Sequence, residues 1–597
     1  MSNEDQEKTS VPSEKRETWG HRVDGIVTLL GYSVGEGTLL KFPYLCARNG
    51  GGAFLIPYLL FVGLCSLPLY FQEVVIGQYY QRGPVEVWKF CPAMKGLGFG
   101  SALVSWVYAM YTSMYFSWYL YFFFNSFFNP LPWSTCGNSW NTPSCVESTL
   151  RHAGMNTTVN GTEYLQGDIN TTKLDLLNMS TDGVASATEE FWRFNALDIS
   201  SGLAHLGSIR WPLFGCLALT YVAMYIMLVK GIRVAGKIVY VTFMLPLLLC
   251  TIILIRGSML PGAIDGLLYM LKPDFTKLAS PTIWIEACGY ALHSMGTSKG
   301  IANTVSSHNQ PNSNCYRLAL IACIVDPLIT IYCGLSIFTV LGHMAYVTGA
   351  SMNDFQSSGL NLAFSVLPEA VTYLPLPQLW SVLVFVMMMT LGLDTTMPSL
   401  EILSEAIGDR FPKLTKRRWL LLLLVFLPSF ILTLPYTTQG GIYMLTLVDW
   451  YSAVPPVMLF GVVECVVLAW VVGVIRINMC TVEMYGQTIP RWLTFLTKYI
   501  TPGLLMTILV YAFYVYRPPK YGDYFYPEWA TVLGWLISVA IVLPTPCWMV
   551  YSVYKSDGTS FKQKLTRAFI PQENKEEVPM DAAEQESLTH AAKTMQM

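Results

Sequence analysis

The sequence predicts an all-α polytopic membrane protein with twelve transmembrane helices. Of its 597 residues, 53% are hydrophobic and only 13% are charged. Apolar segments of about 20 residues or more, the length that crosses the hydrocarbon core of a bilayer, recur along the chain. Two of these segments, the first and the sixth, are interrupted by glycines and contain a charged residue. This composition argues against a soluble multidomain protein and against nucleic acid as a partner.

The twelve predicted spans set the domain organisation. They occupy residues 24–45, 53–78, 99–128, 211–229, 236–256, 281–307, 316–347, 380–407, 417–434, 440–473, 497–516 and 528–553. Basic residues cluster after the fourth and eighth spans, at Lys230, Arg233, Lys237, Lys413, Lys416, Arg417 and Arg418. Because cytosolic loops are enriched in lysine and arginine, we assign both clusters to the cytosol, and the even number of spans places both termini there. We therefore expect a cytosolic tail at 1–22, a twelve-helix core at 23–555 and a cytosolic tail at 556–597, in a multi-pass plasma-membrane protein.

The loop between the third and fourth spans, residues 129–210, has the features of an extracellular segment. It contains four N-x-S/T sequences, which are acceptors for N-glycosylation, at Asn156, Asn160, Asn170 and Asn178. Cys136 and Cys145 lie in the same loop. Since the extracellular compartment is oxidising, we expect these two cysteines to form a disulfide.

The first span is broken near its middle. Gly31, Gly35 and Gly37 interrupt the apolar run, and Glu36 lies between the last two glycines. Irregular backbone at membrane depth is tolerated only inside protein or around a cavity, because lipid cannot satisfy its polar groups. An ionisable side chain there is costly and indicates a functional site. The break and the charge coincide, which predicts a site for a small molecule or an ion.

The sixth span repeats this feature. Its sequence breaks at GTSKG, with Lys299 in the break. Interrupted segments in corresponding positions of two halves are typical of a secondary transporter built from an inverted repeat. Exposed N–H groups at a half-helix N-terminus suit an anion, and unwound carbonyls suit a cation such as Na⁺. The alternative is that each glycine only permits close helix packing.

The eighth span supplies oxygen ligands at membrane depth. Asp394, Thr395 and Thr396 follow one another in the sequence TLGLDTTMPS. Carboxylate and hydroxyl oxygens are the donors that hard cations prefer. A buried aspartate can also be a salt-bridge partner, but the flanking hydroxyls favour a cation site.

Together these elements resemble the neurotransmitter:sodium symporter family. Further stretches that carry the resemblance are RETWGHRVDGI, RNGGGAFLIPY, PLPWSTCGNSWNTPSC, GKIVYVTFMLPLLL, IRGSMLPGA, NCYR and GGIYMLTLVDWYSA. The resemblance covers residues 16–555. The sequences of these motifs are most similar to those of the glycine, GABA and amino-acid carriers. It implies a LeuT-like five-plus-five inverted repeat, two further spans and Na⁺-driven alternating access. Gly35 stands where monoamine carriers have Asp, which argues against a monoamine substrate.

The resemblance also implies a sodium site and two gates. The second sodium site of the family maps to the backbone of Gly31, Val34 and Leu391 and the side chains of Asp394 and Thr395. The external gate maps to Lys41 and Asp449, with Lys where the family usually has Arg, so the bidentate fork is lost. The internal gate maps to Arg16 and Asp409.

Two further ion sites depart from the family pattern. The first sodium site maps to Ser33, Thr38, Ser294 and Asp326, but Thr38 and Asp326 stand where the family has Asn. The chloride positions map to Tyr58, Tyr290, Ser294 and Thr330, with Tyr290 in place of Gln. A fixed carboxylate at Asp326 supplies the negative charge that a halide brings in chloride-dependent members. We therefore expect Na⁺ as the coupling ion and weak or absent dependence on chloride.

The substrate positions depart further. The residues that map to them are Ser33, Gly35, Glu36, Gly37, Tyr108, Tyr111, Thr112, His293, Gly296 and Lys299. Thr112 replaces a tyrosine, and His293 and Lys299 replace residues that are usually aromatic or apolar. Three hypotheses remain open. Glu36 and Lys299 bind opposite ends of a dipolar substrate; or they form a structural ion pair, with Asp326 as a further partner; or the site has lost coupling.

The leading functional hypothesis is a sodium-coupled symporter that imports an amino acid or a related zwitterionic or dipolar molecule by alternating access. The alternative is a transport-incompetent family member that acts as a ligand sensor or as a partner of another membrane protein. An enzyme is not expected, because the sequence has no phosphate-binding loop on a strand, no nucleophile elbow and no metal-hydrolase spacing. The expected partners are the substrate and the lipid bilayer, and the sequence names no protein partner.

Overall fold

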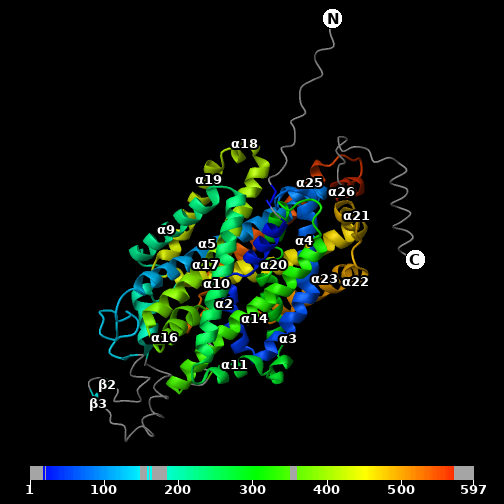
Figure 1. Ribbon diagram of the computed structural model, residues 1–597. Helices are drawn as coiled ribbons and strands as arrows, with labels where there is room; N and C mark the ends of the chain where they lie inside the picture. Colours follow the sequence, from blue (N-terminus) through cyan, green and yellow to red (C-terminus); the bar gives the residue numbers. More distant parts are fainter. Residues whose placement is uncertain are drawn as a thin grey trace.

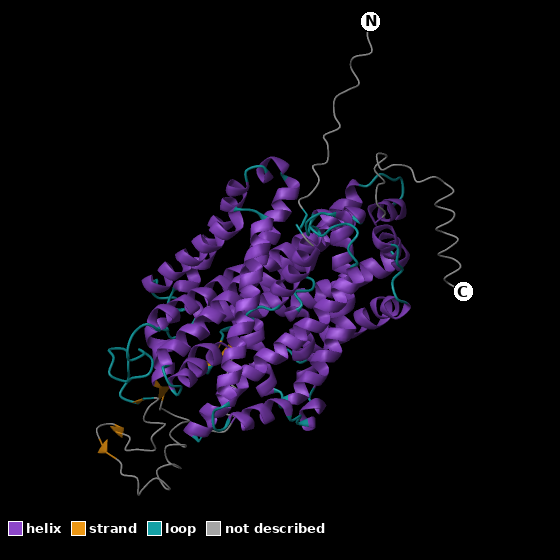
Figure 2. Ribbon diagram, in the orientation of Figure 1, coloured by secondary structure: helices purple, strands orange, loops and turns teal. Residues whose placement is uncertain are grey.

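The computed structural model describes residues 18–20, 22–147, 158–159, 162–163, 185–349, 352 and 359–569. Within these residues the protein is a bundle of helices with only three short two-stranded sheets (Figure 2). Strand β1 (Cys145–Val146) pairs in parallel with β4 (Ala185–Ser186), while β2 (Thr158–Val159) with β3 (Thr162–Glu163) and β5 (Lys520–Tyr521) with β6 (Tyr524–Phe525) are antiparallel. The all-α prediction is therefore confirmed for the described part of the chain.

The helices of the first half follow the predicted spans closely. They are α1 (Arg22–Ser33), α2 (Gly37–Arg48), α3 (Gly52–Phe61), η1 (Val62–Ser66), α4 (Leu67–Tyr80), η2 (Glu86–Phe90), η3 (Pro92–Met94), α5 (Lys95–Asn125), α8 (Ala187–Glu190), η5 (Phe191–Ala196), α9 (Trp211–Val229), α10 (Ile232–Ser258), α11 (Ala263–Leu271), η6 (Phe275–Ala279), α12 (Pro281–Ser294) and α13 (Ile301–Ser306). The pairs α1/α2 and α12/α13 are the two halves of the interrupted spans.

The second half of the chain contains both long helices and short helical segments. They are α14 (Cys315–Thr348), α15 (Gly359–Asn361), η8 (Leu362–Val366), α16 (Leu367–Thr372), α17 (Pro377–Arg410), α18 (Pro412–Thr415), α19 (Arg418–Thr433), η9 (Leu434–Thr437), α20 (Gly441–Val466), η10 (Val467–Val471), α21 (Val474–Tyr485), α22 (Arg491–Phe495), η11 (Leu496–Ile500), α23 (Thr501–Tyr514), α24 (Glu528–Val542), α25 (Pro544–Lys555) and α26 (Phe561–Phe569).

Nine helical segments of the described chain are long and apolar enough to cross a membrane. They correspond to nine of the twelve predicted spans. The other three ranges hold the broken pairs α1/α2 and α12/α13 and the aromatic-rich α5. Each half of a broken pair is too short to cross a membrane by itself.

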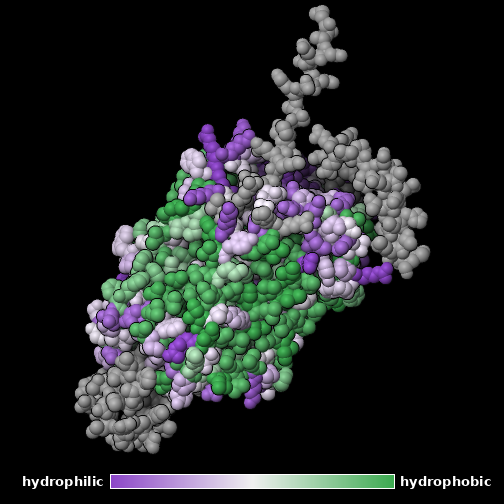
Figure 3. Space-filling model, viewed as in Figure 1, coloured by the Kyte–Doolittle hydropathy of each residue, from purple (hydrophilic) through white to green (hydrophobic). Residues whose placement is uncertain are grey.

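The surface of the molecule agrees with a membrane location. Figure 3 shows a broad hydrophobic belt around the middle of the visible face, with hydrophilic side chains gathered toward its two ends. In Figure 1, α18, α25 and α26 lie toward one end of the bundle, and α11 and α16 lie toward the other. Many large apolar side chains, such as Leu248, Leu424 and Val532, are exposed. Soluble proteins rarely expose apolar surface of this extent.

The two helix breaks are held by neighbouring helices. Between α1 and α2 there is no room for a side chain at Gly35, because a Cβ atom would lie 2.3 Å from Oγ1 of Thr395 on α17. Between α12 and α13 the backbone turns with positive φ at Gly296, Ser298 and Gly300. Glycine adopts this conformation without steric cost, which explains two of these three positions.

The polar groups freed by the second break are satisfied by α4 and α5. The Ser298 N–H donates to the carboxylate of Glu73 on α4. From α5, the hydroxyl of Ser101 donates to the Ser298 carbonyl over 3.2 Å, and the hydroxyl of Ser105 donates to the Lys299 carbonyl over 2.7 Å. Irregular backbone is thus tolerated at this depth because protein, not lipid, supplies the hydrogen bonds.

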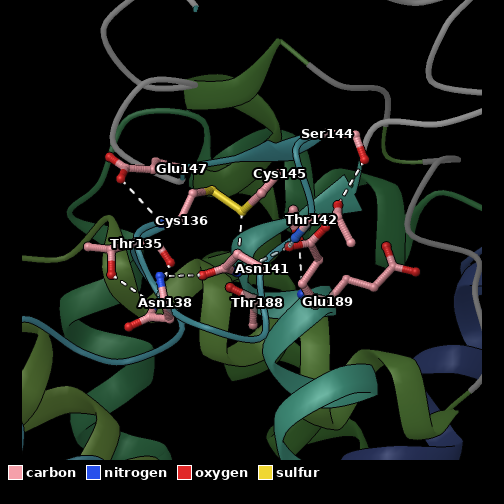
Figure 4. The surroundings of a disulfide bond; sticks show 12 residues. Thr135, Cys136, Asn138, Asn141, Thr142, Ser144, Cys145, Glu147, Thr188 and Glu189 are labelled. Atoms are coloured by element: carbon pink, nitrogen blue, oxygen red, sulfur yellow. Dashed lines mark hydrogen bonds between the residues drawn. A yellow bond between two sulfur atoms is a disulfide. The ribbon is translucent and has the colours of Figure 1, made fainter. Parts of the chain in front are cut away.

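The predicted disulfide between Cys136 and Cys145 is confirmed (Figure 4). It closes a small loop beside β1, and Glu190 of α8 holds this loop from the other side. The carboxylate of Glu190 accepts hydrogen bonds from the Asn141 side chain and the Thr142 backbone. The four predicted glycosylation sites, Asn156, Asn160, Asn170 and Asn178, lie outside the described residues.

Candidate functional site

The first helix break packs against α17 through one threonine. The Glu36 N–H donates to Oγ1 of Thr395 over 3.0 Å, and the same hydroxyl donates to the Leu391 carbonyl over 3.0 Å. The backbone at residues 34–36 is therefore fixed directly opposite Asp394 and Thr395. The structure brings the predicted ligands of the second sodium site onto two facing elements.

Asp394 carries the chemistry expected of a cation ligand. One carboxylate oxygen accepts a hydrogen bond from Thr242 on α10 over 2.5 Å. The other oxygen is buried and has no hydrogen-bond partner in the described structure. A buried carboxylate oxygen without a partner is costly unless a cation or donor reaches it. The residues present therefore fit Na⁺, whose preferred ligands are carboxylate, hydroxyl and carbonyl oxygens.

The residues of the first sodium site and the chloride site form one buried polar cluster. The Ser294 hydroxyl of α12 donates to one oxygen of Asp326 on α14 over 2.7 Å. The other Asp326 oxygen, the Tyr58 hydroxyl and the Thr330 hydroxyl are buried without a hydrogen-bond partner among the described residues. Thr330 lies one helical turn beyond Asp326 on the same face of α14. The cluster has unsatisfied acceptors and donors, which an ion or water would complete.

Tyr290 is adjacent to this cluster but its hydroxyl faces the first helix break. Its ring centroid lies 5.3 Å from that of Tyr58, and its hydroxyl makes a long 3.5 Å contact to the Gly37 carbonyl. Ser33 donates to the Leu29 carbonyl within its own helix over 2.9 Å. Ser33, Thr38 and Ser294 line one small cavity, the central cavity described in the next paragraph.

Lys299 occupies the centre of the bundle together with an imidazole and a phenol. Its Nζ lies 3.0 Å from Nδ1 of His293 and 4.1 Å from the ring centroid of Tyr108. The Tyr108 hydroxyl lies 3.4 Å from Nε2 of the same histidine. These three side chains leave a central cavity of only about 20 Å³, which Gly35, Gly37 and Gly296 also line.

A larger chamber of about 230 Å³ lies beside the central cavity. Its wall contains Glu36, Lys41, Asp449 and several tyrosines. Glu36 is only 4% exposed, and it accepts a 3.3 Å hydrogen bond from Tyr119 of α5. We call this space the outer chamber, defined by its lining residues Glu36, Gly37, Leu40, Lys41, Tyr44, Leu45, Tyr108, Tyr111, Tyr115, His293, Gly359, Leu360, Thr446 and Asp449.

The hypothesis of a direct ion pair between Glu36 and Lys299 is wrong for this structure. Lys299 contacts His293 and Tyr108, and the Glu36 carboxylate contacts Tyr119. Asp326 does not join Lys299 either, since its contact is with Ser294. The two charges lie on the linings of different cavities, because the opened backbone between α12 and α13 turns Lys299 toward α5.

Of the two neighbouring residues predicted to face substrate on α5, only one lines these two cavities. Tyr111 lines the outer chamber. The Thr112 hydroxyl donates to the Tyr108 carbonyl over 2.9 Å and accepts from Thr396 of α17 over 3.0 Å. Thr112 thus packs between α5 and α17, and it lines neither the central cavity nor the outer chamber.

The predicted external gate pair is in contact. Nζ of Lys41 lies 3.3 Å from a carboxylate oxygen of Asp449, and the two side chains are 33% and 23% exposed. Of the internal gate, Asp409 accepts a hydrogen bond from the Gly83 N–H, whereas Arg16 lies outside the described residues.

Three residues that support the site through hydrogen bonds were not predicted from the sequence. Thr242 orients Asp394, Tyr119 contacts Glu36, and Glu73 caps the second break. Glu73 could have been found, because it is an ionisable residue inside the second predicted span. Thr242 and Tyr119 carry no signal of this kind, since a threonine or a tyrosine in an apolar segment is common.

Comparison with known proteins gives a consistent result. Residues 16–556 match the family described as "Sodium:neurotransmitter symporter family". The chain is 36% identical over 566 residues to "Sodium- and chloride-dependent glycine transporter 2" of Xenopus laevis, covering 93% of this chain and 72% of that protein. It is 35% identical over 574 residues to "Sodium- and chloride-dependent glycine transporter 1" of Xenopus laevis, covering 94% and 89%. It is 35% identical over 570 residues to "Sodium-dependent dopamine transporter" of Bos taurus, covering 95% and 78%.

Proposed function

The chain belongs to the sodium:neurotransmitter symporter family and is a sodium-coupled symporter of the membrane, and we propose that it imports an amino acid or a related zwitterionic or dipolar molecule by alternating access. The single observation that supports this proposal most directly is the position of Asp394. Its free carboxylate oxygen is buried, and the next residue, Thr395, accepts a hydrogen bond from the backbone at the break between α1 and α2. Ion binding and solute binding at one broken helix are the basis of coupling.

The architecture proposed for this activity has twelve spans. It consists of the nine long apolar helices together with α1/α2, α12/α13 and α5, arranged as a five-plus-five inverted repeat with two further spans. We assign residues 23–555 to the transporter core, 129–210 to an extracellular glycosylated loop, and 1–22 and 556–597 to cytosolic tails in the plasma membrane. The opposite placement of α11 and of α25/α26 in the bundle supports this orientation (Figure 1).

The ion sites follow from the same geometry. Na⁺ in the second site would be held by the carbonyls of Gly31, Val34 and Leu391 and by Asp394 and Thr395. A further Na⁺ would lie near Ser33, Thr38, Ser294 and Asp326. We propose that Asp326, beside Tyr58, Tyr290 and Thr330, supplies the negative charge of a halide, so that chloride is weakly required or not required. The two glycine transporters similar to this chain are described as chloride-dependent, so this proposal separates the chain from them.

Uptake by the full chain in proteoliposomes tests the function. Radiolabelled amino acids, GABA-like amines and osmolytes are offered with an inward Na⁺ gradient, with Na⁺ and chloride varied independently. We expect at least one compound to accumulate only with Na⁺, and Asp394→Asn to abolish accumulation. The matched control Asp523→Asn changes an aspartate in the exposed β5–β6 turn and should transport normally.

The small central cavity favours a second candidate function. Lys299, His293 and Tyr108 fill the space between the two breaks, which leaves no room there for a transported molecule. Such a transport-incompetent sensor or membrane-protein partner would be stabilised thermally by Na⁺ or by a ligand, yet no compound of the panel would accumulate. Absence of both stabilisation and accumulation would contradict the symporter and the sensor alike.

A further inference from the structure

Glu36 and Lys299, the two charged residues of the helix breaks, face different cavities. Glu36 lines the outer chamber of about 230 Å³, and Lys299 lines the central cavity of about 20 Å³. Tyr108 and His293 line both and form the partition between them. A single small ligand in the outer chamber therefore meets Glu36 but does not meet Lys299.

The charged lining of the outer chamber has an excess of carboxylate. Asp449 is neutralised by Lys41 at 3.3 Å. Glu36 is buried, and the hydrogen bond that it accepts comes from the neutral phenol of Tyr119. No lysine or arginine of the described residues forms an ion pair with Glu36. A buried carboxylate without a counter-ion is expensive, so a cation that enters the chamber gains more there than a neutral molecule of the same shape.

The walls of the chamber suit an organic cation. Tyr108, Tyr111 and Tyr115 form an edge-to-face row along α5, with ring centroids 5.2 Å and 5.9 Å apart. Tyr44 of α2 lines the same chamber. Tyrosine ring faces attract ammonium groups, and a desolvated site strengthens this attraction. An alkylammonium group can contact the tyrosine rings and the Glu36 carboxylate together.

We propose that the outer chamber binds the ammonium group of the ligand, with Glu36 as its counter-ion and the tyrosine row as its wall. This inference rests on the proposed function, and it assigns Glu36 of the outer chamber as the residue that recognises the ammonium group of the substrate. The counter-ion could not be an acidic side chain at position 35, because the Thr395 hydroxyl occupies the space that a side chain there would need. Lys299 is then a positioning residue, which holds His293 and Tyr108 in the partition.

Binding of choline to the purified full chain in Na⁺ provides the first test, with 3,3-dimethylbutan-1-ol as its uncharged isostere. We expect choline to raise the melting temperature and the isostere to have no effect at equal concentration. Glu36→Gln should weaken the choline effect at least tenfold. The matched control Glu189→Gln, in the half-exposed pair with Arg193, should leave it unchanged. Equal stabilisation by both compounds, no stabilisation by choline, or full choline binding by a folded Glu36→Gln would overturn the inference.

A second measurement does not require that Glu36→Gln folds. A cysteine is placed on the chamber wall by Thr446→Cys, and at an exposed position of η6 by Thr276→Cys as the reference. The rates of reaction with cationic 2-aminoethyl and anionic 2-sulfonatoethyl methanethiosulfonate are compared. The cation-to-anion rate ratio should be at least tenfold higher at position 446 than at 276. An equal or lower ratio would contradict an electronegative chamber.

These outcomes separate the inference from the proposed function. Sodium-dependent uptake without discrimination between choline and its isostere would refute the ammonium site and leave the symporter intact. Choline binding that depends on Glu36, in a protein that accumulates no compound of the panel, would refute transport and support the ammonium site.

Discussion

The ammonium nitrogen of Lys299 lies 3.0 Å from Nδ1 of His293. Since an ammonium group only donates, Nδ1 must accept, and the imidazole proton is then assigned to Nε2. Nε2 lies 3.4 Å from the hydroxyl of Tyr108. The Lys299 nitrogen lies over the Tyr108 ring, 4.1 Å from its centroid. The buried Lys299 side chain is thus held by an imidazole acceptor and an aromatic face, and no carboxylate of the described residues is in contact with it.

This relationship predicts a coupling between His293 and Lys299. His293→Phe removes the acceptor and leaves the ammonium group buried without a hydrogen bond, which should cost about 1–3 kcal/mol. The double variant His293→Phe/Lys299→Met removes the cation as well and should recover most of this loss. Thermal unfolding of the purified protein measures both. His205→Phe, at an exposed loop position, is the control, and a double variant no more stable than His293→Phe would contradict the contact.

Thr242 should tune sodium affinity although it is not a proposed ligand. Its hydroxyl donates to Asp394 and fixes the orientation of that carboxylate. Thr242→Val keeps the shape and removes the donor, so we expect the Na⁺ concentration for half-maximal uptake to rise about tenfold, as for other supports of ion ligands. Thr507→Val, whose hydroxyl only bonds to Gly503 within α23, should not change it. An unchanged Na⁺ dependence in Thr242→Val would exclude this orienting role.

Asp326 should determine the response to chloride. Asp326→Asn removes the fixed negative charge and keeps an acceptor for Ser294, so the cluster with Tyr58 and Thr330 would then need an anion. We expect uptake by this variant to fall at least fivefold when chloride is replaced by gluconate, while the parent protein changes little. Asp265→Asn, at an exposed position of α11, should behave like the parent. A parent protein that stops transport in gluconate would refute the halide role of Asp326.

The Cys136–Cys145 disulfide should stabilise the outer loop. The two cysteines are separated by nine positions, and cross-linking a loop of this length is worth roughly 2–3 kcal/mol in the chain-entropy account. Cys136→Ser should therefore lower the melting temperature and expose the loop to proteases. Cys547→Ser removes an exposed free thiol and serves as the control. Equal melting temperatures and equal cleavage of the two variants would show that the Glu190 contacts alone hold the loop.

Much of the fold could be predicted from local sequence. Apolar runs require helices at membrane depth, because no other open backbone satisfies its own hydrogen bonds there. The glycines around Glu36 and Lys299 located both breaks, and the structure confirms them between α1 and α2 and between α12 and α13. The disulfide followed from two cysteines in one outer loop. Each of these features depends on residues that are near one another in the chain.

The partners of the charged residues could not be predicted in this way. Sequence placed Glu36 and Lys299 at two breaks but left open whether they meet, and only the packing of α5 against both breaks decided that they do not. Tyr119 and Tyr108 of α5 contact one charge each, and Tyr108 lies between the two cavities. The sequence by itself determined a membrane-embedded helical carrier with an ion site. Tertiary structure decided which cavity each charge faces, because a charge in a low-dielectric interior is governed by neighbours far away in the chain.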